Sequence, residues 1–304
     1  MTVPNARSGV LRIATRGSAQ AKAQAGAVAE ALVQRHPGLR VELVLVETLG
    51  DRRADVPLHT MGGQGVFVKE VQRALLNGDA EVAVHSAKDL PSSVAAAIDG
   101  VEDLQLAAFC TRRDPRDALV GAALADLRQG ATVATGSVRR SAQLAHVRPD
   151  LHFTELRGNI HTRLGKVPPD GALVMAVAAL QILELTDRIA EYLPVEPFVP
   201  SPGQGCVAVE CRADADWVAE LLAGIDDARS RAAVEAERAF LAELGTGCSL
   251  PVGAHVEGNE LVGFLARPEV GRVLIRRVAL PTDNTRLTVA AGLARELHEE
   301  LHEP

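Results

Sequence analysis

The first 46 residues alternate between strand and helix patterns, and this alternation limits the chain to an α/β fold. Residues 10–14 (VLRIA) form a short apolar run typical of a buried strand, and residues 40–46 (RVELVLV) alternate as a second strand does. The Ala-rich segment between them, Ala19 to Arg35, has helical character and stops at His36-Pro37-Gly38. A strand, a helix and a strand at this spacing predict a βαβ unit with a parallel sheet.

The same alternation continues along the chain and predicts three units. The first is expected to add a helix at 66–77 and strands at 80–85, 104–109 and 206–210. The second begins near Cys110 and is expected to contain strands at 131–135, 151–156 and 171–177, each followed by a helix. The third is expected to contain a helix at 229–244, strands near 252–257, 260–266 and 272–280, and a last helix at 286–302. A length of 304 residues agrees with two or three domains.

Composition argues against several classes of function. The net charge of −7 disfavours general nucleic-acid binding, which needs a basic surface. Residues 131–166 reverse that balance, with six Lys and Arg residues against two acidic ones, and predict a local anion site. The four cysteines include no C-x-x-C pair, no apolar run of 18 residues is present, and the N-terminus lacks a signal pattern. We therefore expect a soluble cytoplasmic protein with reduced thiols and no membrane or nucleic-acid partner.

Three predicted strands end in hydroxyl and cationic side chains at the point where a helix begins. These segments are Thr15-Arg16-Gly17-Ser18, Ser86-Ala87-Lys88-Asp89 and Thr135-Gly136-Ser137-Val138-Arg139-Arg140. Ligands of open α/β sheets bind beyond the carboxyl ends of strands, where helix N-termini attract anions. Each serine or threonine alone could be an ordinary helix N-cap. Three such sites with added Arg or Lys favour recognition of a carboxylate or phosphate.

Three further charged residues have two readings each. Arg157 and Arg163 are six residues apart across a Gly-Asn turn, so they either face one cleft or lie on a solvated helix face. Asp89 follows Lys88 at a strand end that we expect to lie near the arginines. A carboxylate among cations stays ionised. It could therefore hold an N–H group or a developing cation, or form a structural salt bridge.

Three further features of the sequence have more than one reading: the turn at 245–253, the segment 47–65 and a zinc-like pattern near the C-terminus. The turn at 245–253 (GTGCSLPVG) is either a helix C-cap or a mount that presents Cys248 for covalent chemistry. Residues 47–65 contain four glycines and are long for a connection, which is typical of a lid or a disordered loop. His298-Glu299-Glu300-Leu301-His302 matches the H-E-x-x-H zinc pattern, but it ends two residues from the C-terminus. A solvated helix end is the expected reading, with no metal.

Eight blocks in one register, from Leu11 to about Val256, resemble the hydroxymethylbilane synthase family, also called the porphobilinogen deaminase family. They are LRIATRGS (11–18), GGQGVFVKE (62–70), AVHSAKDLP (83–91), RRDPRDALV (112–120), ATGSVRRSAQL (134–144), ELRGNIHTRL (155–164), PSPGQGCVAVECR (200–212) and GCSLPVG (247–253). Residues 257–304 resemble the family loosely. Gln64 departs from the pattern, because many members have Lys there.

The resemblance implies a fold of two lobes like those of type II periplasmic binding proteins, plus a small α/β C-terminal domain. Its implied domains are residues 1–106 with 202–224, residues 107–201, and residues 225–304. It implies a monomeric transferase of porphyrin and haem biosynthesis. Four porphobilinogen molecules would condense head to tail, each losing ammonia, on a covalent dipyrromethane primer. Hydrolysis would then release the tetrapyrrole 1-hydroxymethylbilane.

The resemblance also implies a role for each matching residue. Asp89 would be catalytic, and Cys248 would hold the dipyrromethane cofactor through a thioether. The implied cofactor contacts are Ser18, Ser86, Lys88, Thr135, Ser137, Arg139, Arg140, Gly158 and Arg163. The implied substrate contacts are Arg16, Gln24, Arg157 and Arg188. Each pyrrole carries an acetate and a propionate, so a growing chain needs the cations that these positions supply.

A binding protein for a small anion would use the same strand-end groups without chemistry. Such a protein would need neither Asp89 nor a cysteine on a loop. A zinc hydrolase built on His298 and His302 is a third hypothesis, and it depends on five residues alone.

Overall fold

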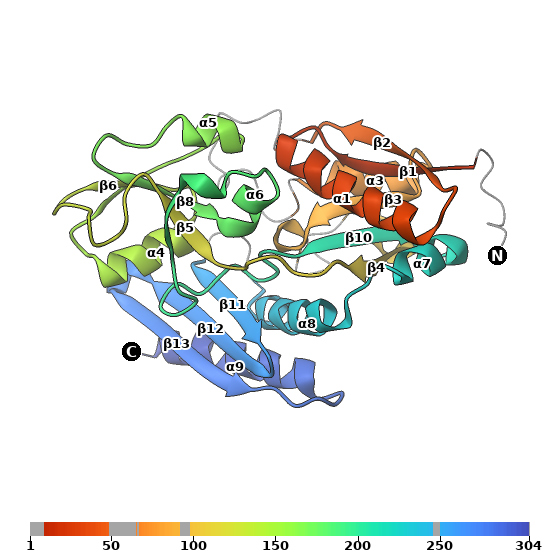
Figure 1. The fold of residues 1–304 in the computed structure, drawn as a ribbon. Coiled ribbons are helices and arrows are strands. Elements are labelled where there is room, and N and C mark those ends of the chain that lie inside the picture. The colour runs from red at the N-terminus through yellow and green to blue at the C-terminus, as the bar shows by residue number, and fades with distance from the viewer. Residues whose placement is uncertain (1–8, 49–64, 66, 92–97, 246–249, 304) are drawn as a thin grey trace. The chain divides into compact units, whose positions relative to one another are not determined.

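The computed structural model describes residues 9–48, 65, 67–91, 98–245 and 250–303. It divides into two compact units, and each is described here by itself (Figure 1). Unit 1 comprises Met1–Arg53, Gln64–Arg112 and Cys206–Arg231, and unit 2 comprises Ala54–Gly63, Arg113–Gly205 and Ala232–Pro304. The three-domain boundaries expected from the sequence stay a prediction. Among the described residues, no helix combines the length and apolar character needed to cross a membrane.

Unit 1 is built on a five-stranded sheet in the order β2-β1-β3-β10-β4. Its strands are β1 (Val10–Arg16), β2 (Arg40–Val46), β3 (Val82–Ser86), β4 (Leu104–Phe109) and β10 (Val207–Arg212). Strand β1 pairs in parallel with β2 and β3, which confirms the predicted βαβ unit. Strand β10 pairs antiparallel with β3 and β4, so the predicted return of this segment to the first sheet is also confirmed.

Helices cover both faces of this sheet (Figure 1). They are α1 (Ala19–Arg35), α3 (Lys69–Leu76) and α7 (Asp216–Ala223). Helices α1 and α7 bury Val28, Leu32 and Leu222 against one set of strand side chains. Helix α3 buries Val71 and Leu75 in a separate cluster with Ala14 and Ala83 of the sheet. Because neighbouring strand residues point to opposite faces, these two clusters form the two sides of one sheet.

Unit 2 contains a second five-stranded sheet in the order β7-β6-β8-β5-β9. Its strands are β5 (Asp117–Val120), β6 (Thr132–Ala134), β7 (His152–Thr154), β8 (Ala172–Ala176) and β9 (Ile189–Tyr192), and its helices are α4 (Val138–Val147), α5 (Ile160–Leu164) and α6 (Val177–Gln181). Strand β6 pairs in parallel with β7 and β8, and β5 is antiparallel to β8. The order repeats that of unit 1, as two lobes of one type require, and the expected fold class is confirmed.

The rest of unit 2 is a small antiparallel sheet with two helices. The sheet has the order β11-β12-β13, and its elements are α8 (Ala228–Glu243), β11 (Val252–Glu257), β12 (Glu260–Arg267), β13 (Arg272–Ala279) and α9 (Arg286–His302). Phe240 of α8 and Leu297 of α9 pack with Leu261 and Leu265 of β12 in one core. This matches the small α/β domain expected at the C-terminal end.

Sequence patterns missed three elements, β5, β9 and α7. Strands β5 and β9 have four residues each, which is too short to establish a period of two. Helix α7 has eight residues and no side-chain cap, so it lacks the usual start signal. By contrast, α1 begins and ends where predicted, because Ser18 caps its first turn and His36-Pro37 closes its last.

Candidate active site

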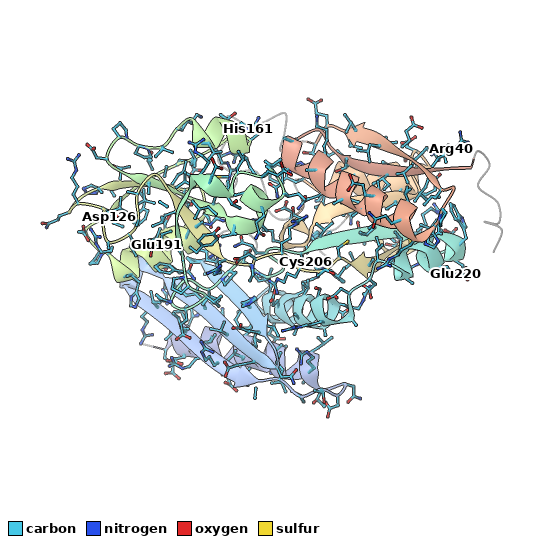
Figure 2. All side chains as sticks on the ribbon, in the orientation of Figure 1. Arg40, Asp126, His161, Glu191, Cys206 and Glu220 are labelled. Atoms are coloured by element: carbon cyan, nitrogen blue, oxygen red, sulfur yellow. The ribbon has the colours of Figure 1, made fainter. Side chains whose placement is uncertain are left out.

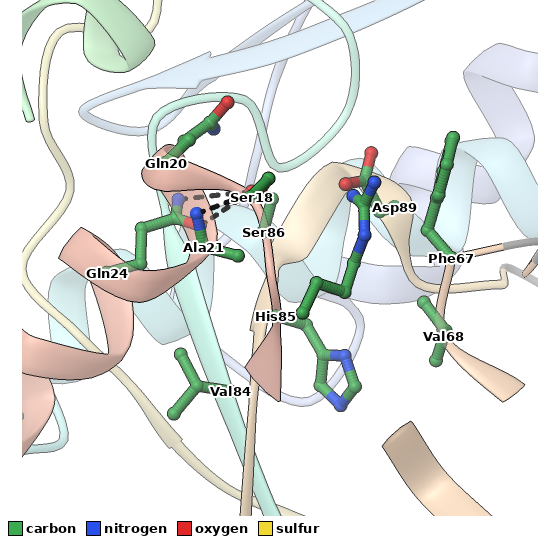
Figure 3. Close-up of a pocket in the computed structure, with 11 residues that line it drawn as sticks. Ser18, Gln20, Ala21, Gln24, Phe67, Val68, Val84, His85, Ser86 and Asp89 are labelled. Atoms are coloured by element: carbon green, nitrogen blue, oxygen red, sulfur yellow. Dashed lines mark hydrogen bonds between the residues drawn. The ribbon is translucent and has the colours of Figure 1, made fainter. Parts of the chain in front are cut away.

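A pocket in unit 1 lies at the carboxyl ends of β1 and β3 (Figure 3). It is lined by Arg16, Ser18, Gln20, Ala21, Gln24, Phe67, Val68, Val84, His85, Ser86 and Asp89. Five of the residues singled out from the sequence therefore line one pocket: Arg16, Ser18, Gln24, Ser86 and Asp89. The strand order produces this arrangement, because β1 and β3 are parallel neighbours and end at the same edge of the sheet.

Hydroxyl groups fix the wall of the pocket that α1 supplies. The Ser18 hydroxyl accepts a hydrogen bond of 3.2 Å from the Ala21 backbone N–H, so Ser18 is the N-cap of α1. The Ser86 hydroxyl lies 3.1 Å from both polar atoms of the Gln24 amide, donating to Oε1 and accepting from Nε2. The N-cap reading is thus right for Ser18, and the same residue also lines the pocket.

Charged and aromatic groups supply the other walls. The Arg16 guanidinium carbon lies 4.0 Å from the centre of the Phe67 ring, a cation–π distance. Lys88 and Asp89 belong to the short 3₁₀ helix η2 (Ala87–Asp89), which follows β3 directly. The Ala87 backbone N–H donates to the carbonyl of Cys206 at 3.0 Å. Cys206 is the residue before β10 and is labelled in Figure 2. The catalytic candidate thus sits on a turn that is tied to two strands of the sheet.

In unit 2, Arg139 and Arg140 converge on a buried carboxylate that sequence reasoning missed, Asp117. Arg139 Nη2 lies 2.8 Å from Asp117 Oδ2, and Arg140 Nη2 lies 2.7 Å from Oδ1. All three side chains are buried, with exposed fractions of 5% for Arg139, 9% for Arg140 and 1% for Asp117. Two guanidinium groups share one carboxylate, and this trio therefore carries one excess positive charge out of water.

Polar neighbours complete this cluster. Arg139 also donates to the Val199 carbonyl at 2.7 Å, and Arg140 donates to the Val174 carbonyl at 3.2 Å. The Gln204 amide donates to Asp117 Oδ1 at 2.9 Å. Burial alone would raise the pKa of Asp117, but the two guanidiniums hold that pKa well below its ordinary 3.8. Burial lowers the pKa of Arg139 below its ordinary value, and the Asp117 carboxylate offsets part of that change.

The other unit 2 candidates occupy helix starts and turns. Ser137 is the N-cap of α4. The Ser137 backbone N–H donates a 3.2 Å hydrogen bond to the Thr135 hydroxyl. Gly158 has a φ of +116°, and its carbonyl accepts a 2.8 Å hydrogen bond from Arg163 Nε. Arg157 is partly buried. Arg188 is exposed, at the end of the 3₁₀ helix η5 (Thr186–Arg188).

Cys248 and Gln64 lie outside the described residues, as does most of the 47–65 segment. The expected proximity of Asp89 to the unit 2 arginines stays a prediction, because these residues belong to different units. In the described part of the chain, no cluster of three His, Cys, Asp or Glu residues is placed to hold a metal ion. At the end of α9, the rings of His298 and His302 stack with centres 4.3 Å apart.

Known proteins resemble this chain along most of its length. Residues 11–220 match the family model "Porphobilinogen deaminase, dipyromethane cofactor binding domain", and residues 231–301 match "Porphobilinogen deaminase, C-terminal domain". The chain belongs to the porphobilinogen deaminase family. This confirms the family, the class of transferase and the dipyrromethane cofactor that the sequence blocks implied.

Individual members of the family are close in sequence. The porphobilinogen deaminase of Acidothermus cellulolyticus is 50% identical over 254 residues, which cover 81% of this chain and 74% of that protein. The enzyme of Syntrophotalea carbinolica is 45% identical over 283 residues, covering 90% and 88%. Among solved structures, the methionine binding protein MetQ is 14% identical, with a TM-score of 0.46 over 73% of this chain and 92% of that one.

The donor groups of both units fit the family's cofactor. Dipyrromethane bears acetate and propionate side chains, so its binding site must supply cations and hydrogen-bond donors. The Asp117 trio provides an excess cation, and the unit 1 pocket provides an arginine beside hydroxyl groups. The sequence contained no signal for Asp117 or Phe67 as site residues, although both lie within the family blocks at 112–120 and 62–70.

Proposed function

We propose that this chain is a hydroxymethylbilane synthase. It condenses four porphobilinogen molecules head to tail with loss of ammonia, and it hydrolyses the finished chain to release 1-hydroxymethylbilane. One observation carries the proposal beyond family membership. The Asp89 carboxylate lines a pocket with Arg16 at the shared carboxyl edge of β1 and β3. A carboxylate beside an arginine suits a substrate that carries two carboxylates and becomes cationic as it reacts.

Asp89 has two tasks in this proposal. As ammonia leaves porphobilinogen, positive charge develops on the pyrrole ring. A carboxylate that accepts the pyrrole N–H stabilises that charge where it forms. The same carboxylate can hold or pass the proton that the departing amine requires. Arg16, whose guanidinium is already stacked on Phe67, binds a substrate carboxylate with its planar fork.

The remaining residues hold ligands. When bound, dipyrromethane supplies the pyrrole carbon to which substrate units are joined. We propose that Cys248 carries it through a thioether. Its proposed contacts are Ser18, Ser86, Lys88, Thr135, Ser137, Arg139, Arg140, Gly158 and Arg163. The proposed substrate contacts are Arg16, Gln24, Arg157 and Arg188.

The geometry of each unit supports the contacts proposed for the cofactor and the substrate. In unit 2, the two buried arginines keep one positive charge beyond what Asp117 neutralises, and this favours a ligand carboxylate. In unit 1, the hydrogen bond between Gln24 and Ser86 holds helix α1 against the end of β3. The amide and hydroxyl are thereby oriented before any ligand arrives, which lowers the ordering cost of binding.

A substitution at Asp89 tests the proposed catalytic role. We expect Asp89→Asn to lower ammonia release from porphobilinogen by about 10²- to 10⁴-fold, the range typical of a lost general acid or base. Asp99→Asn is the matched control, because Asp99 is an exposed aspartate of the same unit. Its turnover should equal that of the unchanged protein. Near-normal turnover in folded, cofactor-loaded Asp89→Asn protein would contradict the role of Asp89.

We also propose that the protein is a cytoplasmic monomer with the domain boundaries 1–106 with 202–224, 107–201 and 225–304. Light scattering during size-exclusion chromatography should then give the mass of one chain at every loading concentration. A mass that doubles as the loading concentration rises would contradict the monomer.

A further inference from the structure

A buried polar cluster shares one residue, His85, with the lining of the unit 1 pocket and takes no part in the chemistry described above. It consists of His85, Glu210 and Gln72, whose exposed fractions are 5%, 5% and 2%. His85 Nε2 lies 2.9 Å from Glu210 Oε2, a salt-bridge distance. Gln72 Nε2 donates to both carboxylate oxygens of Glu210, at 3.0 Å and 3.1 Å. His85 is also one of the residues that line the pocket (Figure 3).

Each member of the cluster comes from a different element of unit 1. His85 belongs to β3, one residue before Ser86 and four before Asp89. Glu210 belongs to β10, at the point where its register with β4 shifts. Gln72 belongs to α3, whose first residue follows the pocket residues Phe67 and Val68. The cluster therefore joins the element that leads to Asp89 to the element that leads from Phe67.

A carboxylate buried in this way is costly to leave without polar partners. The Gln72 amide donates to Glu210 on one side, and on the other side the His85 ring nitrogen lies 2.9 Å away, although His85 Nε2 makes no hydrogen bond in this arrangement. An apolar contact between α3 and the sheet would tolerate small shifts. A carboxylate that is held by two hydrogen bonds from Gln72 and faces a ring nitrogen at 2.9 Å does not, because a buried charge that loses its polar partners is costly.

We propose that Glu210, through His85 and Gln72, is a positioning residue for the Asp89 pocket. It fixes helix α3 against β3 and so sets the separation between the Phe67 wall and Asp89. This inference rests on the proposed function, since it assumes that Asp89 does the chemistry. Its consequence is kinetic: displacing Asp89 from the reacting group slows the reaction more than it weakens binding, because proton transfer and charge stabilisation require contact distance.

The test begins with Glu210→Gln. A glutamine at 210 has one acceptor oxygen and no charge, so Gln72 can no longer donate to two carboxylate oxygens and the negative charge beside His85 is lost. We expect kcat for porphobilinogen to fall about 10- to 100-fold, with KM changed less than about threefold. Cofactor loading of the variant, measured by intact-mass spectrometry, should stay complete. That result separates a fall in kcat from a failure to assemble the enzyme.

A double variant supplies the rescue. Gln72→Glu combined with Glu210→Gln restores matched partners, because the glutamine at 210 can accept from His85 and donate to the new carboxylate at 72. We expect this pair to recover most of the lost kcat. It also covers the case in which Glu210→Gln alone fails to fold. A folded double variant that remains as slow as the single one would overturn the proposal.

The matched control is a second buried His–Glu pair, in unit 2. His255 Nδ1 lies 3.3 Å from Glu237 Oε1, and both residues are buried, but neither lines the pocket. His255→Gln should lower the melting temperature. At temperatures below the unfolding transition, its kcat should equal that of the unchanged protein. If His255→Gln and Glu210→Gln lose the same stability and show the same fall in kcat, the fall reflects a general loss of stability. That result would overturn the proposal.

Different results would contradict the proposed function and the positioning role of Glu210. If the unchanged protein releases no ammonia from porphobilinogen, the proposed function itself is wrong. If the unchanged protein is active and Glu210→Gln matches it in kcat and KM, the function stands and the positioning role of Glu210 is wrong.

Discussion

At the scale of single residues, the least expected feature is the carboxylate of Asp117 between two arginines. Arg139 and Arg140 were expected to project from the start of a helix towards an anion. The structure shows instead that both side chains are buried and that each is already paired with Asp117. A buried pair of this kind adds little net stability, yet removing one partner is costly because it leaves the other charge unpaired. Asp117 therefore determines whether both arginines can stay in place.

Replacing Asp117 tests this dependence. Asp117→Asn should lower the free energy of unfolding by about 3–5 kcal/mol at pH 7, since two guanidiniums would then be buried without a carboxylate. Urea denaturation of the two proteins measures the difference. The neutral Asn has nearly the size of Asp, so the loss reports charge rather than packing. Equal stability at pH 7 would contradict the account of this cluster.

The same variant predicts a dependence on pH. The pKa of Asp117 is lower in the folded protein than in the unfolded chain, where it is about 3.9. The stabilisation is thus fully present above about pH 5 and is lost as pH falls towards the folded pKa. The stability gap between the unchanged protein and Asp117→Asn should be constant from pH 5 to 8 and should narrow below pH 4. A gap that widens in acid would contradict the sign.

Sequence reasoning found residues by local context and missed residues defined by remote partners. Arg16, Ser18, Ser86 and Asp89 stood out because each follows an apolar strand. Asp117 and its arginines are 22 and 23 residues apart, and Glu210 and Gln72 are 138 apart. No helical or strand period links such positions, so nothing in the sequence distinguishes these acids from solvated ones. The packing of helices α3 and α4 against the strands that carry the acids brings them together.

At the scale of elements, the long helices were predictable, but only some of the short strands were. Helix α1 and the final helix α9 match their predicted bounds because each has 17 residues with a sustained apolar period. Helix α3 begins at Lys69 rather than residue 66, since its N-cap Val68 makes no side-chain hydrogen bond. Strand β5 was missed entirely, and it is the strand that carries Asp117. Its four residues, Asp117–Val120, begin with a charged residue and give no period of two to detect.

Packing of the C-terminal sheet on its two helices gives a prediction at this scale. A Cβ atom on Gly263 of β12 would lie 2.7 Å from the Phe240 ring and 3.1 Å from Leu297. Gly263→Ala should therefore cost about 1–3 kcal/mol by overpacking. Gly292→Ala, in α9 of the same domain, meets nothing within 4 Å and should stabilise by about 0.5–1 kcal/mol. Thermal melts of both variants should move in opposite directions, and a shift of the same sign would contradict this packing.

At the scale of the whole molecule, two units share one strand order, and each carries groups that suit an anionic ligand. Unit 1 has Asp89, Arg16 and the hydroxyl groups of its pocket, and unit 2 has the buried arginines. The chain has a net charge of −7, but residues 131–166 have an excess of cations. The attraction for an anionic ligand is therefore local. The central claim is that this chain builds its product on a cofactor that Cys248 holds covalently.

Intact-mass spectrometry of the purified protein tests that claim most directly. The unchanged protein should be heavier than its sequence by two condensed pyrrole units, and Cys248→Ala should have the mass of its sequence. Cys110→Ala is the matched control: burial raises the pKa of the Cys110 thiol to about 11, so Cys110 is a poor nucleophile and its loss should leave the adduct intact. Active protein without added mass, or an adduct that survives in Cys248→Ala, would contradict the account.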